Sequence, residues 1–293
     1  MMTMTARALL VGSGFLGGAI AAELARAGWE TETVARAGQH ALDLGTGSGR
    51  AALHRLAATG GYDLVLLCHG PSDVTWCEEN PGAAQDTHVR TAAAVSGTGV
   101  ATLLISTDNV FPGTHTSLRP DDPPGPANVY GRVKLAAEQA VRAHGGRVIR
   151  VSLVYGWSGD GRRRNFAERC LTDLRAGRAV RAPHDQVMTP VYVDDVAVAV
   201  AAYAGAPDRE LPVVHVAGPS ALSRAAFARL AARALGVPED LVVPVPRAET
   251  TLACRPAFSG LASGPFCPDG ALDGFQPRDP AAGLAAMLAA EGR

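Results

Sequence analysis

The chain is almost devoid of lysine: of its 27 lysine and arginine residues, only residue 134 is a lysine. Lys134 follows Tyr130 by four residues. Lysine carries a compact ammonium on a flexible stem that can sit beside a phenol and tune its acidity, whereas arginine forks and stays charged. We therefore interpret Tyr130 and Lys134 as a catalytic pair, with a solvated lysine on a helix surface as the alternative.

An excess of charge of either sign is also missing. The formal net charge is -1 and the isoelectric point is near 6.7, which creates no field for collecting polyanions. Nucleic acid and an anionic membrane surface are therefore poor main partners. A small molecule is the expected partner instead.

Paired cysteines and long apolar runs are absent as well. The five cysteines are odd in number and show no C-x-x-C spacing, which argues against a disulfide framework and a zinc site and fits a reducing compartment. No stretch reaches the roughly 20 apolar residues that a membrane-spanning helix needs. We expect a soluble, cytoplasmic protein with no metal site.

Apolar runs of strand length alternate with helical patterns over the first two thirds of the chain. Near-continuous hydrophobic strands separated by helices predict a parallel sheet covered on both faces. This is a doubly wound α/β fold of the Rossmann type, with ligands at the carboxyl ends of the strands. The predicted strands are residues 8–11, 31–35, 64–67, 101–106 and 147–151, and the helices are 15–27, 49–58, 83–95 and 129–144.

The pattern changes after residue 155. Residues 238–280 are dense in proline and glycine, whereas 212–217 read as one more strand of the main sheet. We predict an NAD(P)-binding domain of residues 1–155 and 187–217, and a smaller, discontinuous substrate-binding lobe of residues 156–186 and 218–293. The oligomeric state is left open, a homodimer included.

A glycine-rich turn joins the first predicted strand to the first helix, the context that makes G-x-G-x-x-G a dinucleotide fingerprint. Its first glycine permits the turn, the second lets the backbone approach a pyrophosphate, and the third lets the helix pack on the sheet. The helix N-terminus then receives the phosphates. A purely structural turn is the alternative, and the residues are Gly12, Ser13, Gly14, Phe15, Leu16 and Gly17.

The end of the second strand indicates which dinucleotide to expect. The Asp or Glu that would hold an NAD ribose about 20 residues after the fingerprint is missing, and Arg36 stands there. Arg36 could pair with a 2′-phosphate, so NADP(H) is favoured while NAD(H) and a solvent-facing arginine stay open. Further cofactor contacts are predicted from Asp43, Leu44, Cys68, His69 and Gly70.

Tyr130 can supply a proton to a carbonyl that receives hydride. A nearby ammonium and an oxidised nicotinamide both favour the phenolate and lower a pKa of about 10. Ser106 and Thr107, at the end of a buried strand, can donate a hydrogen bond to the same oxygen. As strand-end hydroxyls, they could instead cap backbone groups.

Five segments carry patterns of one known family. Residues 105–113 resemble its ISTDYVF-x-G segment, 130–135 its YG-x-x-KL, 77–81 its CE-x-x-P, 185–195 its DQ-x-x-x-P-x-x-x-DD and 255–261 its RP-x-x-S-x-L. The chain thus resembles, over nearly its whole length, the dTDP-4-dehydrorhamnose reductase family of extended short-chain dehydrogenase/reductases. Several matches in the same order are far more specific than any one alone.

The resemblance implies NAD(P)H-dependent reduction of the 4-keto group of a nucleotide-linked deoxysugar, with dTDP as the expected nucleotide. Tyr130 would be the general acid, Lys134 would hold the nicotinamide ribose and lower the pKa of Tyr130, and Thr107 would polarise the carbonyl. Relatives that dehydrate sugar nucleotides carry an Asp-Glu pair after this threonine. The glutamate is missing here, which disfavours dehydration.

The chain departs from the family at three positions of the expected substrate pocket. Asn109 stands in place of a tyrosine, His88 of an asparagine and Leu153 of a tryptophan. Altered walls around a retained catalytic pair fit a different 4-keto-deoxysugar, as used in secondary metabolites such as antibiotics. His88 is expected to act as a polar anchor, to join a proton relay, or to be a satisfied helix histidine.

Arginines of the second lobe are expected to grip the substrate diphosphate. Arg162, in the run 162–164, and Arg255 could each make bidentate contacts, unless they belong to solvated basic turns. Two further functions stay open. They are reduction of a non-sugar ketone such as a polyketide carbonyl, and a regulatory role like that of the methionine adenosyltransferase beta subunit, which resembles the same family.

Overall fold

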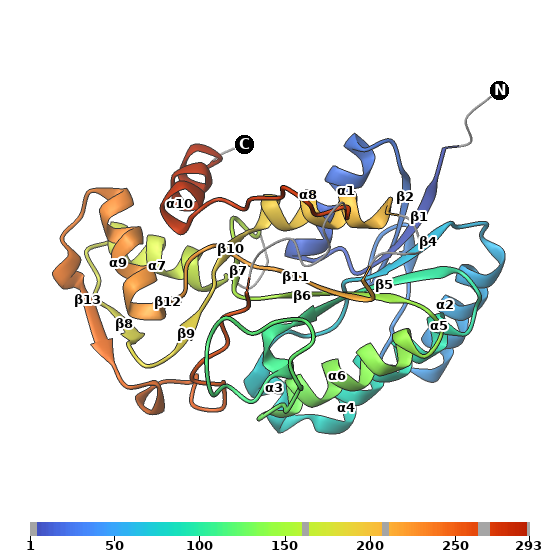
Figure 1. Cartoon of the computed structure of the whole chain (residues 1–293), viewed down its shortest axis with the longest axis horizontal. Helices are drawn as coiled ribbons and strands as arrows, with labels where there is room; N and C mark the ends of the chain where they lie inside the picture. Colours follow the sequence, from blue (N-terminus) through green and yellow to red (C-terminus); the bar gives the residue numbers. More distant parts are fainter. Residues whose placement is uncertain (1–4, 160–163, 207–210, 263–269, 292–293) are drawn as a thin grey trace.

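The computed structural model describes residues 5–159, 164–206, 211–262 and 270–291. A seven-stranded, all-parallel sheet in the order β11-β6-β5-β4-β1-β2-β3 forms its centre (Figure 1). The chain reverses its direction of winding between β1 and β4, so ligands are expected at that switch point. The strands are β1 Arg7–Val11, β2 Glu30–Ala35, β3 His40–Ala41, β4 Leu64–Leu67, β5 Ala101–Thr107, β6 Arg147–Val151 and β11 Val213–Val216.

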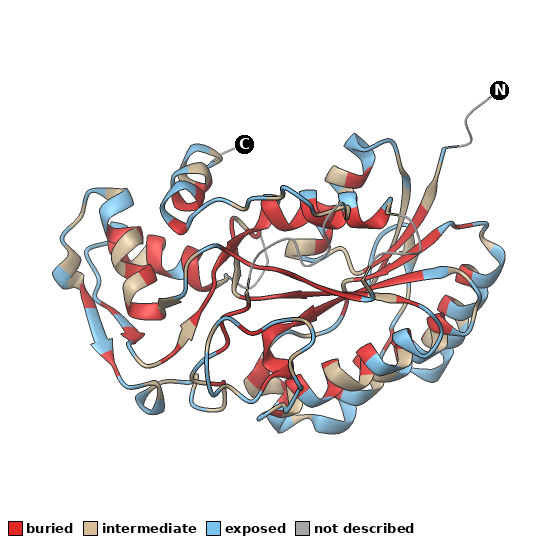
Figure 2. Cartoon of the chain, viewed as in Figure 1, coloured by how far each residue is buried: buried red, intermediate tan, exposed pale blue. Residues whose placement is uncertain are grey.

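Helices cover both faces of the sheet, as the sequence predicted. α1 (Phe15–Arg26) and α8 (Val193–Ala204) pack on one face, and α2 (Gly47–Thr59), α5 (Thr91–Ser96) and α6 (Val129–Arg142) pack on the other. Alternate strand residues point to opposite faces, so each layer has its own apolar core. Figure 2 shows the sheet and the inner helix faces buried and the outer helix faces exposed. The doubly wound α/β prediction is confirmed.

A second core lies beyond the carboxyl edge of the sheet. α7 (Phe166–Arg175), α9 (Arg224–Leu235) and α10 (Pro280–Ala289) pack together there with the ribbon of β8 (Val180–Pro183) and β13 (Val242–Val245). Short ribbons join the two parts: β7 (Val154–Tyr155) with β10 (Val191–Tyr192), and β9 (Val187–Met188) with β12 (Leu222–Ser223). We keep the predicted division of the chain at residues 155, 187 and 217 as a proposal.

The segment before β5 differs from the single predicted helix. It consists of α4 (Pro81–Gln85), a π-helical turn η1 (Asp86–Arg90) and α5, preceded by α3 (Val74–Glu79). Asp73 begins α3 by accepting hydrogen bonds from the N–H groups of Thr75 and Trp76. The spacing of apolar residues in the sequence does not reveal a π-helical turn. Such turns are frequent at functional sites. Three short 3₁₀ turns complete the structure: η2 Asp108–Val110, η3 Glu239–Leu241 and η4 Arg247–Glu249.

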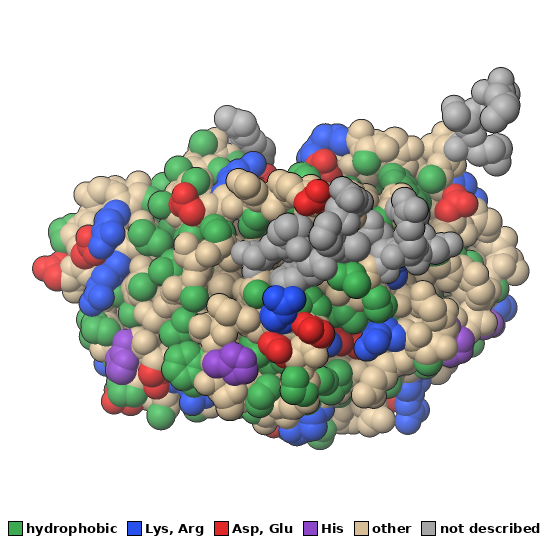
Figure 3. Space-filling model, in the orientation of Figure 1, with side chains coloured by type: hydrophobic (Ala, Val, Ile, Leu, Met, Phe, Trp, Pro, Cys, Tyr) green, Lys and Arg blue, Asp and Glu red, His purple; other side chains and the backbone are tan. Residues whose placement is uncertain are grey.

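The described surface is mixed in charge. Figure 3 shows positive and negative side chains interspersed on the described part of one face. Among the described helices, none combines the length and apolar character needed to cross a membrane. The described residues also contain no cluster of three or more side chains arranged to bind a metal.

Candidate active site

A cavity of about 420 Å³ opens at the carboxyl ends of β1, β4, β5 and β6, between the sheet and the second core. Residues from segments far apart in the chain meet there, as expected for a switch point. Of the predicted site residues, its lining contains Gly14, Phe15, Leu16, Gly17, Cys68, His69, Gly70, Ser106, Thr107, Asn109, Tyr130, Lys134, Leu153 and Arg255.

The predicted fingerprint forms the turn into α1. Gly12 has a φ of +106° and lies so close to the end of β4 that a Cβ would come within 2.6 Å of the Cys68 carbonyl oxygen, so only glycine fits. Gly14 is the N-cap of α1, with no side-chain cap and no acidic residue in the first turn. The first N–H groups of α1 therefore face the cavity without a side-chain acceptor, an arrangement that fits a pyrophosphate.

The predicted contacts to the adenosine end lie outside the cavity lining. Arg36 is exposed directly after β2, where it can reach a ligand at the strand end. Asp43 is exposed and its carboxylate accepts the N–H of Gly45 at 3.0 Å. Leu44 is only 9% exposed and packs in the core beneath α2, so its side chain is structural.

Tyr130 and Lys134 lie one turn apart on α6 and both line the cavity. Lys134 is 4% exposed, and its Nζ donates a hydrogen bond to the carbonyl oxygen of Ile105 at 2.6 Å. Burial lowers the pKa of Lys134 to about 8. The ammonium is therefore mostly charged at neutral pH, but it loses its proton more readily than an exposed lysine.

The phenol of Tyr130 is held in its protonated form. Burial raises its pKa well above the ordinary value, and the negative charge of Asp108 raises it further. The positive charge of Arg255 and a hydrogen bond with Thr107 lower it. A buried, protonated phenol within hydrogen-bonding reach of Thr107 is suited to donate a proton to a nearby oxygen.

A polar network, unpredicted apart from Thr107 and Asn109, surrounds Asp108. The Asp108 side chain is buried, with 6% of it exposed. Its Oδ1 accepts hydrogen bonds from Thr107 Oγ1 at 3.0 Å and from Asn109 Nδ2 at 2.8 Å. Its Oδ2 accepts a hydrogen bond from Ser152 Oγ at 2.9 Å. Burial raises the pKa of Asp108, and these hydrogen bonds oppose that effect. Asn109 Oδ1 also accepts from Nδ2 of Asn128, the N-cap of α6, at 3.0 Å. The network thus connects the end of β5 to the helix that carries the predicted catalytic pair.

His88 lies behind the cavity, outside its lining. It is 2% exposed in η1, and its ring centroid is 5.9 Å from that of Tyr130 and 6.1 Å from that of His69. Its Nε2 donates to the Pro71 carbonyl oxygen at 3.1 Å, and burial lowers its pKa well below the ordinary value. A neutral ring bonded to a backbone carbonyl supports the loop after β4. This geometry favours a structural histidine over a proton relay.

Arginines of the second core also line the cavity. Arg224, at the start of α9, is 4% exposed; its Nε donates to Gln186 Oε1 at 2.6 Å, and its guanidinium lies 4.7 Å from the Phe166 ring centroid. Burial lowers its pKa to about 9, the charge of Arg255 lowers it further, and no carboxylate of the described residues forms an ion pair with it. Arg164 and Arg169 line the same cavity. A buried cation with no acidic partner is a natural ligand for an anion.

The structure places only one of the two arginines that were predicted to bind a diphosphate. Arg162 lies outside the described residues. Arg255 lines the cavity, but it interacts electrostatically with Asp108 and Tyr130 and so lies toward the reacting end. Arg224 was missed because nothing in the local sequence distinguishes it from a surface arginine; its place after the helix cap Ser223 was the one available signal.

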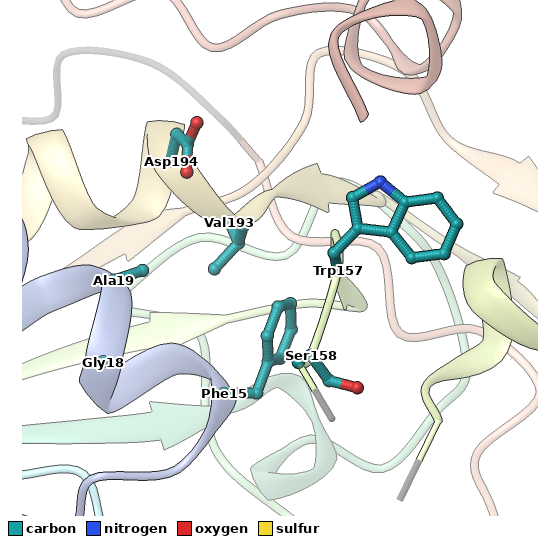
Figure 4. Close-up of a pocket in the computed structure, with 8 residues that line it drawn as sticks. Phe15, Gly18, Ala19, Trp157, Ser158, Val193 and Asp194 are labelled. Carbon is teal, nitrogen blue, oxygen red and sulfur yellow. The ribbon is translucent and has the colours of Figure 1, made fainter. Parts of the chain in front are cut away.

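A second hollow of about 420 Å³ lies on the far side of Phe15 (Figure 4). Its described lining comes from α1, the start of α8 and the segment after β7. Figure 4 shows the side chains of Phe15, Val193 and Trp157 near one another, with Asp194 farther away on α8. The Trp157 indole donates to the Met287 carbonyl oxygen. With Asp194 as the one charged group in this described lining, we assign the chemistry to the main cavity.

This fold and site are suited to the reduction of a ketone with a nicotinamide cofactor. They define the class of NAD(P)-dependent extended short-chain dehydrogenase/reductases. A family model sharpens this assignment. The model of the RmlD substrate binding domain matches residues 6–290, and the chain belongs to that family.

Several known proteins are similar to this chain in sequence or in structure. The dTDP-4-dehydrorhamnose reductase of Mycolicibacterium smegmatis is 31% identical over 89% of this chain and 79% of its own. The crystal structure of dTDP-4-dehydrorhamnose reductase from Bacillus anthracis in complex with NADP is 22% identical, with a TM-score of 0.82 over 98% of this chain and 99% of that chain. Methionine adenosyltransferase 2 subunit beta of Xenopus tropicalis is 34% identical over 36% of this chain and 32% of its own.

The predicted family, fold and enzyme class are therefore confirmed, and the chain is an NAD(P)-dependent oxidoreductase. The roles of its individual site residues stay predictions.

Proposed function

We propose that the chain reduces the 4-keto group of a nucleotide-linked 4-keto-deoxysugar, with NADPH as the hydride donor and dTDP as the nucleotide. The observation that carries the proposal is the presence of two kinds of group in one cavity. Tyr130 and Thr107 line it together with Arg224, a buried arginine of the second core that forms no ion pair with a carboxylate of the described residues. A ketone linked to a diphosphate provides a partner for each kind of group, which a neutral polyketide carbonyl does not.

The reaction needs a hydride and a proton. When bound, the reduced nicotinamide supplies the hydride to the carbonyl carbon. Tyr130 donates its phenolic proton to the carbonyl oxygen, and Thr107 positions the phenol through their hydrogen bond. Lys134 offers an ammonium at the same end of the cavity, which stabilises the phenolate left behind. The apolar side chains of Leu153, Met188 and Phe166 help to keep water out.

The choice of NADPH rests on Arg36. Its exposed guanidinium follows β2 directly, where an NAD-binding chain would carry an acidic residue. A reductase with the same fold is known in complex with NADP. Dissociation constants measured for NADPH and NADH test this choice, and equal values would count against it.

The sugar is proposed to differ from that of the named relatives. Leu153 lines the cavity where the family carries a tryptophan, and Asn109 belongs to the network around Asp108 where the family carries a tyrosine. These altered walls support a 4-keto-deoxysugar of secondary metabolism, such as one used in an antibiotic. The free thiols of Cys68, Cys77, Cys170 and Cys254 are consistent with our proposal of a cytoplasmic enzyme.

The test is NADPH consumption with a panel of dTDP-4-keto-deoxysugars, comparing the wild type with Tyr130→Phe. We expect turnover by the wild type and a loss of at least about 100-fold in kcat for the variant, because it lacks the general acid. NADPH affinity should stay close to that of the wild type. Tyr62→Phe, far from the cavity beside Glu32, is the matched control and should keep its activity.

Two results would contradict this proposal. Tight NADPH binding by a wild-type enzyme that turns over no ketosugar would shift the assignment to a non-sugar ketone or a regulatory role. Full activity of Tyr130→Phe would remove Tyr130 from the chemistry.

A further inference from the structure

Helix α6 carries four ionisable side chains at four-residue spacing, of which the last, Arg142, is exposed. Tyr130, Lys134 and Glu138 therefore lie on one face of the helix, one turn apart. Lys134 and Glu138 are 4% and 1% exposed, and α6 packs against β5. The first two residues belong to the proposed chemistry. Glu138 does not line the cavity, so its burial beside Lys134 has to be explained in another way.

Glu138 is held by an arginine from a central strand. Arg150 of β6 stands opposite Ser106 of β5 in the sheet register and is 3% exposed. Its Nε lies 3.0 Å from Oε1 of Glu138, and its Nη2 lies 2.8 Å from Oε2. A fully buried ion pair adds little net stability over apolar side chains of the same size. Stability alone is therefore a weak reason for this pair.

Glu138 acts on two neighbours that face the catalytic end of the cavity. Its Oε1 accepts the hydroxyl proton of Ser106 at 2.5 Å, so that proton is turned away from the cavity. Burial lowers the pKa of Lys134 to about 8, and Cys68 and the negative charge of Glu138 oppose this fall. The polar groups around Lys134 from all adjoining elements are Cys68, His69, His88, Tyr130, Glu138 and the carbonyl of Ile105.

We propose that Glu138 and Arg150 are positioning residues of this reductase site, an inference that rests on the proposed function. Glu138 keeps the ammonium of Lys134 charged and draws the Ser106 hydroxyl away from the ketone. Arg150 fixes the carboxylate where it can do both. Tyr130, which is hydrogen-bonded to Thr107, is then the hydroxyl group that donates to the substrate oxygen.

The scarcity of lysine makes a direct test practical. Because Lys134 is the only lysine, protein labelled with carbon-13 at lysine Cε gives a single lysine resonance. Its titration midpoint can be followed by NMR without substrate or cofactor. In Glu138→Gln/Arg150→Met, which removes both charges and nearly preserves side-chain size, we expect the midpoint to fall by about one pH unit.

The matched control is an exposed pair of the same chemistry. Arg181 and Glu249 lie 3.0 Å apart with more than half of each side chain exposed. The corresponding Glu249→Gln/Arg181→Met variant should leave the midpoint of Lys134 in place. The alkaline limb of kcat/KM should move with the midpoint in the Glu138/Arg150 variant and stay unchanged in the control.

A folded Glu138→Gln/Arg150→Met protein with the wild-type midpoint would overturn the proposal and leave the pair a structural role only. If that variant does not fold, Glu138→Asp draws the charge back by one methylene and should lower the midpoint by a smaller amount. An unchanged midpoint in folded Glu138→Asp would equally overturn the proposal. A lowered midpoint in an enzyme that reduces no ketosugar would support this inference while removing the proposed substrate, so the two failures are distinguishable.

Discussion

Among single residues, the contacts of each hydroxyl group determine which side chain can act at the reacting centre. Ser106 and Thr107 are adjacent at the end of β5, and the sequence treats them alike. In the structure, Ser106 donates to Glu138 and Thr107 donates to Asp108, but Thr107 is also hydrogen-bonded to the phenol of Tyr130. Thr107 is therefore the better candidate for a role beside the general acid.

Thr107→Val and Ser106→Ala should separate these two roles. Thr107→Val keeps the shape and removes the hydroxyl that is hydrogen-bonded to the phenol, so kcat should fall about 100-fold because the general acid loses its positioning partner. Ser106→Ala removes a proton that already points to Glu138, so its loss should be several-fold at most. Steady-state kinetics of both variants check this prediction, and equal losses would refute it.

Among the elements, α6 carries the proposed catalytic pair, so the way it begins determines where Tyr130 lies. Its N-cap is Asn128, whose Oδ1 accepts the N–H of Gly131 at 2.7 Å and whose Nδ2 donates to Asn109 Oδ1 and to the Cys254 carbonyl oxygen. The cap thus joins the helix to the end of β5 and to the loop that carries Arg255. Loss of the cap should disturb both helix stability and the placement of the phenol.

Asn128→Ala tests this link against the N-cap of a distant helix. Removing either N-cap should lower the free energy of unfolding by about 1 kcal/mol. Asp279→Ala, which removes the cap of α10, is the control because Asp279 lies away from the cavity. Urea unfolding should show similar losses, whereas kcat should fall clearly only in Asn128→Ala. A fall of equal size in Asp279→Ala would contradict the coupling.

For the whole molecule, the cavity depends on two cores meeting across the ends of the strands. Helix α6, packed on the sheet, supplies the predicted catalytic pair, and the second core supplies Arg224 for the proposed diphosphate. Arg224→Met keeps the apolar stem and removes a charged hydrogen-bonding group. The dissociation constant for dTDP should rise about 10- to 100-fold.

Calorimetry with dTDP and NADPH checks the role of Arg224. NADPH affinity should change little, because the proposed dinucleotide contacts lie on the sheet side. Arg233→Met on the same helix, where Arg233 is exposed and paired with Glu239, is the matched control. Unchanged dTDP binding by Arg224→Met would place the diphosphate elsewhere.

Acid stability of the whole chain should reflect its buried histidines. Burial lowers the pKa of His69 to about 4 and that of His215 to about 3, and it lowers the pKa of His88 well below the ordinary value. Below a pH of about 6.5 the unfolded chain binds protons that the folded chain does not, so stability falls as the pH falls. Each histidine contributes up to about 1.4 kcal/mol per pH unit over that window.

His88→Asn removes one of these contributions. Urea unfolding between pH 7 and pH 4 should show a shallower loss of stability in the variant than in the wild type. Parallel curves would show that His88 takes up its proton in the folded state as readily as in the unfolded state.

Some of the site was predictable because its signals are local. Lys134 could be singled out because it is the only lysine in the sequence. The Gly12 to Gly17 turn could be recognised because it lies between a predicted strand and a predicted helix. The Glu138–Arg150 pair and the network around Asp108 were missed, since each joins residues of ordinary type from separate segments. Leu44 was assigned to the cofactor although it packs in the core, because a one-dimensional pattern does not show which way a side chain faces.

Local periodicity and composition were sufficient for the long strands of the sheet, most of the helices that cover it and the glycine turn into α1, and they singled out the predicted catalytic pair, because each depends on neighbours within a few residues. Three other features are visible only in the tertiary structure. The Ser106 hydroxyl donates to Glu138, and His88 is buried outside the lining of the cavity. Arg224 lines the same cavity as the ends of the strands. These outcomes depend on how β5, α6 and α9 pack against one another. Packing joins positions as far apart as residues 106 and 224, where no short-range pattern in the sequence can report it.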